Sequence, residues 1–302
     1  MEHKSYFIAF CKFSVTEFTL LVTSRELLLD AQKNKYAIGA FNVENMEMVL
    51  AVLNAAEETR SPVIMQTTPG TLKYAGADFY FANIRAAAMR SNIPVVCHLD
   101  HGNSFETAIL AFHTGYTSIM IDGSKLPFEE NIALTKSVVD VCHAGNVPVE
   151  AELGRVGGKE DDLDNTGLHN PFTDPDEAAE FVERTECDSL AVGIGTAHGI
   201  YKGTPRINFD VLSKIHELVS VPLVLHGTSG VPDEQVIKSI GLGICKVNYA
   251  TDLRIAFTNG VKEYMKGSPE GFDPKKYGAL GMSEVTRYVI ERMHVIGSCN
   301  RA

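Results

Sequence analysis

Residues 94–102 read PVVCHLDHG, an apolar run that opens with proline and ends in an acid and a histidine. Such a run is typical of a strand buried on both faces of a parallel sheet, because its apolar residues do not alternate with polar ones. Proline is tolerated where a strand begins. Runs of this kind recur along the chain, and we predict strands at residues 37–43, 63–67, 94–99, 118–122, 147–153, 189–195, 222–226 and 244–248.

The segments between these runs have the apolar spacing of helices, for example at residues 46–59, 105–114, 129–144 and 176–186. Eight strand–helix units in about 250 residues indicate a closed barrel. An open doubly wound sheet is disfavoured, since no G-x-G-x-x-G motif follows the first strand. We therefore predict an α/β protein, a single parallel (β/α)8 TIM barrel over residues 23–302, preceded by an arm of residues 1–22.

Composition excludes several kinds of partner. The formal net charge is −11 and the pI is near 5.4, so the field of the protein repels nucleic acid and anionic membranes. No apolar stretch approaches the roughly 20 residues that span a bilayer. The six cysteines contain no C-x-x-C pair and several lie in apolar runs, which indicates reduced thiols and a cytoplasmic enzyme.

Polar residues gather where the predicted strands end, which is where barrel enzymes carry their chemistry. Six consecutive strands end in this way, with Asp100 and His101, Asp122, Glu150 and Glu152, His198, His226, and Asn248. A single histidine has many structural uses, but three on one rim can form the tripod of a catalytic zinc site. We therefore predict that His101, His198 and His226 bind a metal. His98 faces the opposite side of its strand from Leu99 and is a candidate to support a ligand.

Glycines flank these histidines and indicate a second kind of site. Gly199, Gly227 and Gly230 allow a ligand to approach the backbone, and the last long helix begins just after Asn248. A helix N-terminus offers free amides to an anion, and barrels often hold a phosphate in the loops after strands seven and eight. We predict phosphate binding here. Residues 154–175 form a long irregular loop after the fifth strand, and loops of that length are usually functional.

The chain resembles the class II fructose-bisphosphate and tagatose-bisphosphate aldolases from about residue 24 to its end. The matching stretches, in family order, are AFNVEN, SPVIMQTTPG, HLDHGNSFE, SIMIDGS, VEAELGRVGGKEDD, AVGIGTAHGIY, PLVLHGTSG and ICKVNYATDL. The resemblance implies reversible cleavage of a ketose 1,6-bisphosphate to dihydroxyacetone phosphate and glyceraldehyde 3-phosphate. A Schiff-base lysine is not needed, and we expect the rim to carry Lys159 and Lys246 as its lysines.

The resemblance also implies the role of each site residue. Zn²⁺ is held by His101, His198 and His226, with Asp122 and Glu152 at an alternative, more buried metal position. Asp100 exchanges a proton with the C4 hydroxyl, and Glu160 exchanges the proton at the dihydroxyacetone phosphate carbon. A monovalent cation, Na⁺ or K⁺, is expected near the glycines. The substrate contacts are Gly199, Gly227, Thr228, Ser229, Asn248, Tyr249, Ala250 and Thr251, with Asn42 and Thr68 further out.

Two features favour tagatose 1,6-bisphosphate over its C4 epimer, fructose 1,6-bisphosphate. GTAHG resembles the tagatose branch, and Ala250 stands where fructose enzymes usually have Asn or Asp. Gly102 points the other way, because known tagatose enzymes have a second histidine there, so the fructose enzyme is the alternative. We expect a homo-oligomer, either a dimer or a tetramer, and keep open a non-catalytic companion subunit.

Two rival functions are less well supported. A zinc hydrolase on the same barrel would usually carry H-x-H on its first strand, which here reads AIGAFNV. A chain that is itself a non-catalytic companion subunit should have lost metal ligands, whereas all three histidines and Asp100 are present.

Overall fold

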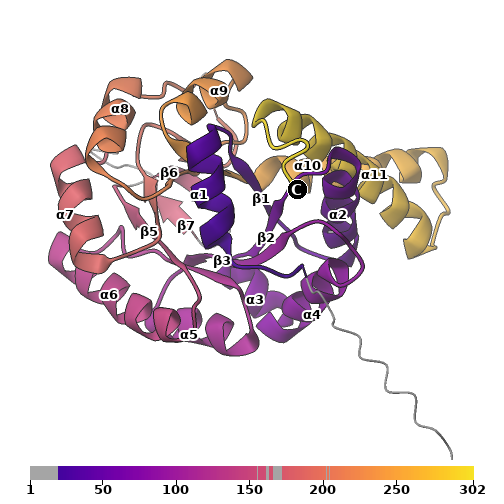
Figure 1. Cartoon of the computed structure of the whole chain (residues 1–302). Coiled ribbons are helices and arrows are strands. Elements are labelled where there is room, and N and C mark those ends of the chain that lie inside the picture. The colour runs from indigo at the N-terminus through magenta and orange to yellow at the C-terminus, as the bar shows by residue number, and fades with distance from the viewer. Residues whose placement is uncertain (1–19, 155, 161–162, 166–171, 202, 204) are drawn as a thin grey trace, which may run out of the picture.

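Eight parallel strands close into a barrel in the computed structural model, which describes residues 20–154, 156–160, 163–165, 172–201, 203 and 205–302 (Figure 1). Their order around the barrel is β1-β11-β10-β8-β5-β4-β3-β2. This confirms the predicted (β/α)8 fold. The barrel strands are β1 (Ile38–Asn42), β2 (Val63–Thr67), β3 (Val95–Gly102), β4 (Ser118–Ile121), β5 (Val149–Leu153), β8 (Ser189–Val192), β10 (Leu223–Leu225) and β11 (Ile244–Tyr249).

Helices surround the barrel and bury the outward faces of its strands (Figure 1). They are α2 (Met46–Thr59), α3 (Pro69–Ala75), α4 (Ala77–Ala88), α5 (Phe105–Thr114), α6 (Phe128–Ala144), α7 (Pro175–Thr185), α8 (Phe209–Leu218), α9 (Asp233–Gly241), α10 (Thr251–Gly267) and α11 (Pro274–Val295). Within the part of the chain that the structure describes, no helix combines the length and apolarity needed to cross a membrane.

One further helix, α1 (Ser24–Asn34), closes the end of the barrel where the strands begin (Figure 1). Its buried Leu28 and Ala31 belong to a cluster with Ile38 and Ile64 from the barrel strands. Ser24 bonds across to Ser118 at the start of β4, with 2.9 Å between the hydroxyl oxygens. The expected arm ends here: residues 20–22 lie beside Val95 at the start of β3, and residues 1–19 lie outside the described part.

Strand β3 runs past its predicted end because it contains a β-bulge. Leu99 pairs with Ile119 of β4, and the next pair joins Gly102 to Ile121. Two residues of β3 therefore lie between these pairs where β4 has one. A bulge of this kind bends a strand and redirects its side chains, and bulges are common beside active sites.

The bulge places two consecutive side chains inside the barrel mouth. In a regular strand Asp100 and His101 would face opposite sides of the sheet. Here His101 has a positive φ of 49°, a conformation that non-glycine residues adopt rarely and mostly where surrounding structure enforces it. Both side chains are at most 3% exposed. The local backbone thus brings an acid and a histidine to the same point.

Part of the segment after β5 forms strands. The expectation of an irregular loop over residues 154–175 is therefore wrong for residues 157–160 and 163–165. Strand β6 (Gly157–Glu160) pairs antiparallel with β7 (Leu163–Asn165) and parallel with β9 (Ala197–His198). Gly158 is the register partner of His198. The segment therefore lies directly beside one of the three predicted metal ligands.

The bulge leads to a test of stability. A Cβ at Gly102 would lie 2.4 Å from the backbone oxygen of Met120 and 2.9 Å from a methyl of Leu99. We expect Gly102→Ala to lower the free energy of unfolding by about 1–3 kcal/mol, the usual cost of overpacking. Urea unfolding followed by circular dichroism measures this. The matched control is Gly241→Ala in α9, where a Cβ meets no atom within 4 Å; equal stability of the two variants would contradict the prediction.

Candidate metal centre and active site

Three histidines from three strand ends meet in the barrel mouth. His101 comes from β3, His198 from β9, and His226 directly follows β10. One ring nitrogen from each lies within 4.8 Å of the others. The closest approach is 2.9 Å, between Nδ1 of His226 and Nε2 of His101. The structure therefore brings the predicted tripod together.

In two of these histidines, the ring nitrogen that faces away from the other histidines contacts a carboxylate. Nδ1 of His101 is 2.9 Å from Oδ2 of Asp122, and Nε2 of His226 is 2.9 Å from Oε1 of Glu150. Carboxylates that bind the far nitrogen of a metal-ligating histidine fix its tautomer and its ring orientation. The nitrogens that remain face one another. Three imidazole nitrogens arranged in this way fit a divalent metal such as zinc.

A second group of donors lies immediately beside the first. His101, Asp122 and Glu152 have ligand atoms within 4.8 Å of one another, and Oε2 of Glu152 is 3.6 Å from Nδ1 of His101. These are the residues expected at the alternative, more buried metal position. Because both groups use His101, through different nitrogens, the two positions are adjacent.

The electrostatics of this cluster favour a cation. Burial lowers the pKa of His101, but Asp100, Asp122 and Glu152 outweigh it and raise that pKa to about 10. Burial, reinforced by Asp122, raises the pKa of Glu152 well above its usual value. The rise in the pKa of His101 reflects the negative charge of three carboxylates in a place with little water to screen it. A divalent ion would compensate that charge.

Asp100 is held beside the tripod by two amides. Asn42 donates to its Oδ2 and Asn248 donates to its Oδ1, each at 3.1 Å. Burial raises the pKa of Asp100, but His101 and His226 outweigh it, so the pKa lies below its ordinary value. The group is therefore an oriented, ionised carboxylate that can accept a proton from a neighbouring hydroxyl.

A small cavity collects most of the predicted substrate contacts together with Asp100 and His198. Its lining residues are Asn42, Asp100, His198, Gly199, Gly227, Thr228, Ser229, Asn248, Ala250 and Thr251. Two predicted contacts lie outside it. Tyr249 faces the opposite side of its strand, where its ring stacks on Phe41 at 5.5 Å, and the hydroxyl of Thr68 caps α3 by accepting from the amide of Thr71.

The other expected acid, Glu160, is the last residue of β6, and its side chain lies outside the described part, as does that of Lys159. The second expected rim lysine is not at the rim. Lys246 is fully buried within the barrel, where Nζ lies 2.8 Å from Glu150. Strand alternation could have indicated this, since Lys246 is two residues before the inward-facing Asn248.

Tyr201 is a positioning contact that sequence reasoning missed. Its hydroxyl accepts from the amide of Ala197 at 2.6 Å and donates to the carbonyl of Gly227 at 2.7 Å. It therefore joins the segment that carries His198 to the segment that follows His226. Only its place in the stretch AHGIY could have drawn attention to it.

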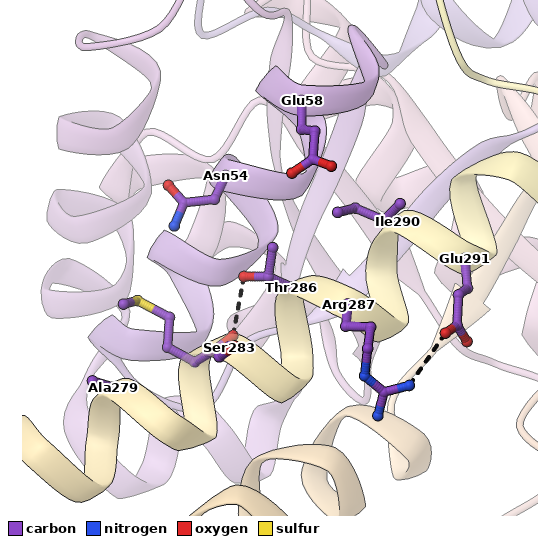
Figure 2. A pocket seen from close by; sticks show the side chains of 9 residues that line it. Asn54, Glu58, Ala279, Ser283, Thr286, Arg287, Ile290 and Glu291 are labelled. Atoms are coloured by element: carbon purple, nitrogen blue, oxygen red, sulfur yellow. Dashed lines mark hydrogen bonds and ion pairs between the residues drawn. The ribbon is translucent and has the colours of Figure 1, made fainter.

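A larger cavity lies away from this chemistry, on the outer surface between α2 and α11 (Figure 2). It measures about 580 Å³ and is lined by Asn54, Glu58, Thr286, Ile290 and other residues of these two helices. Its lining contains no histidine or cysteine. The functional site is therefore identified by its chemistry and not by its size.

A parallel barrel whose strand ends bring together a histidine tripod and an oriented carboxylate defines the class of metal-binding barrel enzymes. Residues 22–301 match the model of the family described as fructose-bisphosphate aldolase class-II. The chain belongs to this family. It is therefore a class II aldolase, a lyase that acts on carbon–carbon bonds.

Two solved structures illustrate the likeness. The YdjI aldolase from Escherichia coli K12 is 40% identical, with a TM-score of 0.84, and the match covers 93% of this chain and 99% of that one. The fructose-bisphosphate aldolase of Campylobacter jejuni is 25% identical, with a TM-score of 0.80 and coverage of 93% and 97%. The similarity thus extends over the whole barrel.

Proposed function

We propose that the chain is a zinc-dependent aldolase that reversibly cleaves tagatose 1,6-bisphosphate to dihydroxyacetone phosphate and glyceraldehyde 3-phosphate. The observation that carries this proposal is the pair of imidazole nitrogens of His101 and His226 that face each other beside Asp100. Zinc bound by these two histidines and His198 would polarise the ketose carbonyl as a Lewis acid.

The phosphate of the dihydroxyacetone half is proposed to bind between the glycines and the start of α10. Gly199 and Gly227 line the cavity and have positive φ angles of 83° and 64°, a conformation that glycine adopts without steric cost. Thr251 lines the same cavity and begins α10, and the N-terminus of a helix favours an anion. Ser229 lies in the same cavity. A monovalent cation, Na⁺ or K⁺, is proposed beside these glycines.

Two acids are proposed to move protons. Asp100, oriented by Asn42 and Asn248, would accept the proton of the C4 hydroxyl during cleavage and return it during synthesis. Glu160, next to the backbone that pairs with β9, would exchange the proton at the dihydroxyacetone phosphate carbon.

The choice of tagatose rests on Ala250 and on the GTAHG stretch. Ala250 lines the cavity beside Asp100 and His198 and contributes only a methyl group where fructose enzymes usually have a polar side chain. Fructose 1,6-bisphosphate, named in the family description and for the Campylobacter jejuni enzyme, is the alternative substrate. The cytoplasmic location, the dimer or tetramer and the companion subunit remain predictions from the sequence.

If the three histidines bind zinc, replacing one of them should reduce the zinc content of the protein. Wild-type protein should bind about one zinc per chain, and His198→Ala should lose most of that zinc together with aldolase activity, because two protein nitrogens hold zinc poorly. Elemental analysis after gel filtration measures the metal. His216→Ala, which changes a histidine of α8, is the control and should behave as wild type. Full zinc occupancy in His198→Ala would contradict the tripod.

The role of Asp100 predicts a loss of rate without loss of metal. Asp100→Ala and the isosteric Asp100→Asn should keep zinc while kcat falls by about 10²–10⁴-fold, the usual contribution of a general acid–base group. A coupled assay of triose phosphate release, with zinc measured on the same samples, tests this. Activity of Asp100→Asn within about tenfold of wild type would mean that another group moves the proton.

The substrate assignment predicts a preference between two epimers. We expect kcat/KM for tagatose 1,6-bisphosphate to exceed that for fructose 1,6-bisphosphate by about tenfold or more, a ratio that one hydrogen bond made to only one of the two C4 configurations would supply. We further expect Ala250→Asp to reduce the ratio. A wild-type preference for fructose 1,6-bisphosphate would reject the sugar assignment and leave the aldolase class intact.

A further inference from the structure

Lys246 forms an ion pair across the inside of the barrel. It lies on β11, whereas its partner Glu150 lies on β5, and these strands are not neighbours in the barrel. Nζ of Lys246 is 2.8 Å from Oε2 and 3.1 Å from Oε1 of Glu150. Both side chains are at most 2% exposed. The lysine therefore engages both oxygens of one fully buried carboxylate.

The same carboxylate contacts a proposed zinc ligand. Oε1 of Glu150 is 2.9 Å from Nε2 of His226, and Nδ1 of His226 faces His101 on the other side of the ring. Because a carboxylate accepts a proton from the nitrogen it binds, this contact keeps the hydrogen on Nε2 and the lone pair on Nδ1. Nδ2 of Asn248, a donor that would favour the opposite tautomer, lies 3.2 Å from the same Nε2, so the contact with Glu150 decides which nitrogen of His226 is available to a metal.

We propose that Lys246 is a positioning residue for the metal centre, which acts through Glu150 on His226. The inference rests on the proposed function insofar as it requires a metal at the three histidines. Glu150 has several rotatable bonds, and the ammonium group fixes the plane of its carboxylate by binding both oxygens. Nε2 of His98 lies 3.7 Å from Oε2 of Glu150, beyond hydrogen-bond distance, so Lys246 makes the stronger contact with that oxygen.

The surroundings of Lys246 exclude direct contact with the substrate. Its amine lies beneath the histidines, between Glu150 and Nε2 of His98 at 3.4 Å, so it does not line the cavity where a substrate carbonyl would bind. His98 is itself fixed, with Nδ1 2.8 Å from the hydroxyl of Ser118. A purely structural ion pair is the remaining alternative, and it makes a different prediction about metal affinity.

The experiment measures zinc affinity by competition with a chromophoric chelator, in folded protein checked by circular dichroism. Lys246→Met should weaken zinc binding by about 10–100-fold, the usual effect of removing a group that orients a ligand. It should also change the visible absorption bands of the Co²⁺-substituted protein. Ser118→Ala, which disturbs the same buried network on the side of His98, is the control and should bind zinc as wild type does.

A double variant separates positioning from general damage. In a Glu150→Gln background the further change Lys246→Met should alter zinc affinity by less than about twofold, because both substitutions remove the same orienting contact. This double variant leaves neither member of the Lys246–Glu150 pair as an unpaired buried charge, so it remains testable if Lys246→Met alone fails to fold.

Three results would overturn the inference. They are wild-type zinc affinity in folded Lys246→Met, fully additive losses in the double variant, and an equal loss in Ser118→Ala. If the wild-type protein binds no zinc, the proposed function fails and this inference fails with it. If the wild type binds zinc and Lys246→Met binds it equally well, only the role of Lys246 is rejected.

Discussion

The structure depends on how negative charge is balanced inside the barrel. Asp100, Asp122, Glu150 and Glu152 are each at most 5% exposed, and they share one small volume. Burying a carboxylate is costly unless it is paired and hydrogen-bonded. Lys246 pairs with Glu150, the raised pKa of His101 lets its imidazole offset part of the remaining charge, and amides orient Asp100. A divalent cation at the three histidines would offset more of this charge.

This concentration of charge is possible because the barrel is polarised along its axis. The end where the strands begin is filled by apolar side chains and closed by α1, whose Leu28 packs with Ile38 and Ile64. Outward-facing strand residues pack against the helices. The apolar packing thus lies under α1 and on the outside of the barrel, whereas the charged groups, including the buried pair of Lys246 and Glu150, lie in the interior toward the other end.

The sequence predicted the barrel strands well, because these strands are runs of consecutive buried residues. Each predicted run overlaps a barrel strand, since strands buried on both faces stand out from their surroundings, although β3 and β11 extend past their predicted ends. The three histidines were found because strand ends converge. The side-chain direction of Tyr249 could have been derived from strand alternation but was not. The bulge at residues 100–101 could not have been predicted, because one inserted residue leaves no periodic signal. The pairing of β6 with β9 could not have been predicted either, because it depends on contacts between residues distant in sequence.

Because of the bulge, part of the site depends on the number of residues in β3 as well as on their identity. Removing one codon between Leu99 and Gly102 would restore regular pairing with β4 and could keep the barrel intact, yet only one side chain would then point inward. Restoring the lost group would require re-creating an insertion, which point substitutions cannot supply. A lineage that lost this residue would therefore keep a folded barrel and have no short mutational route back to the acid beside the histidine.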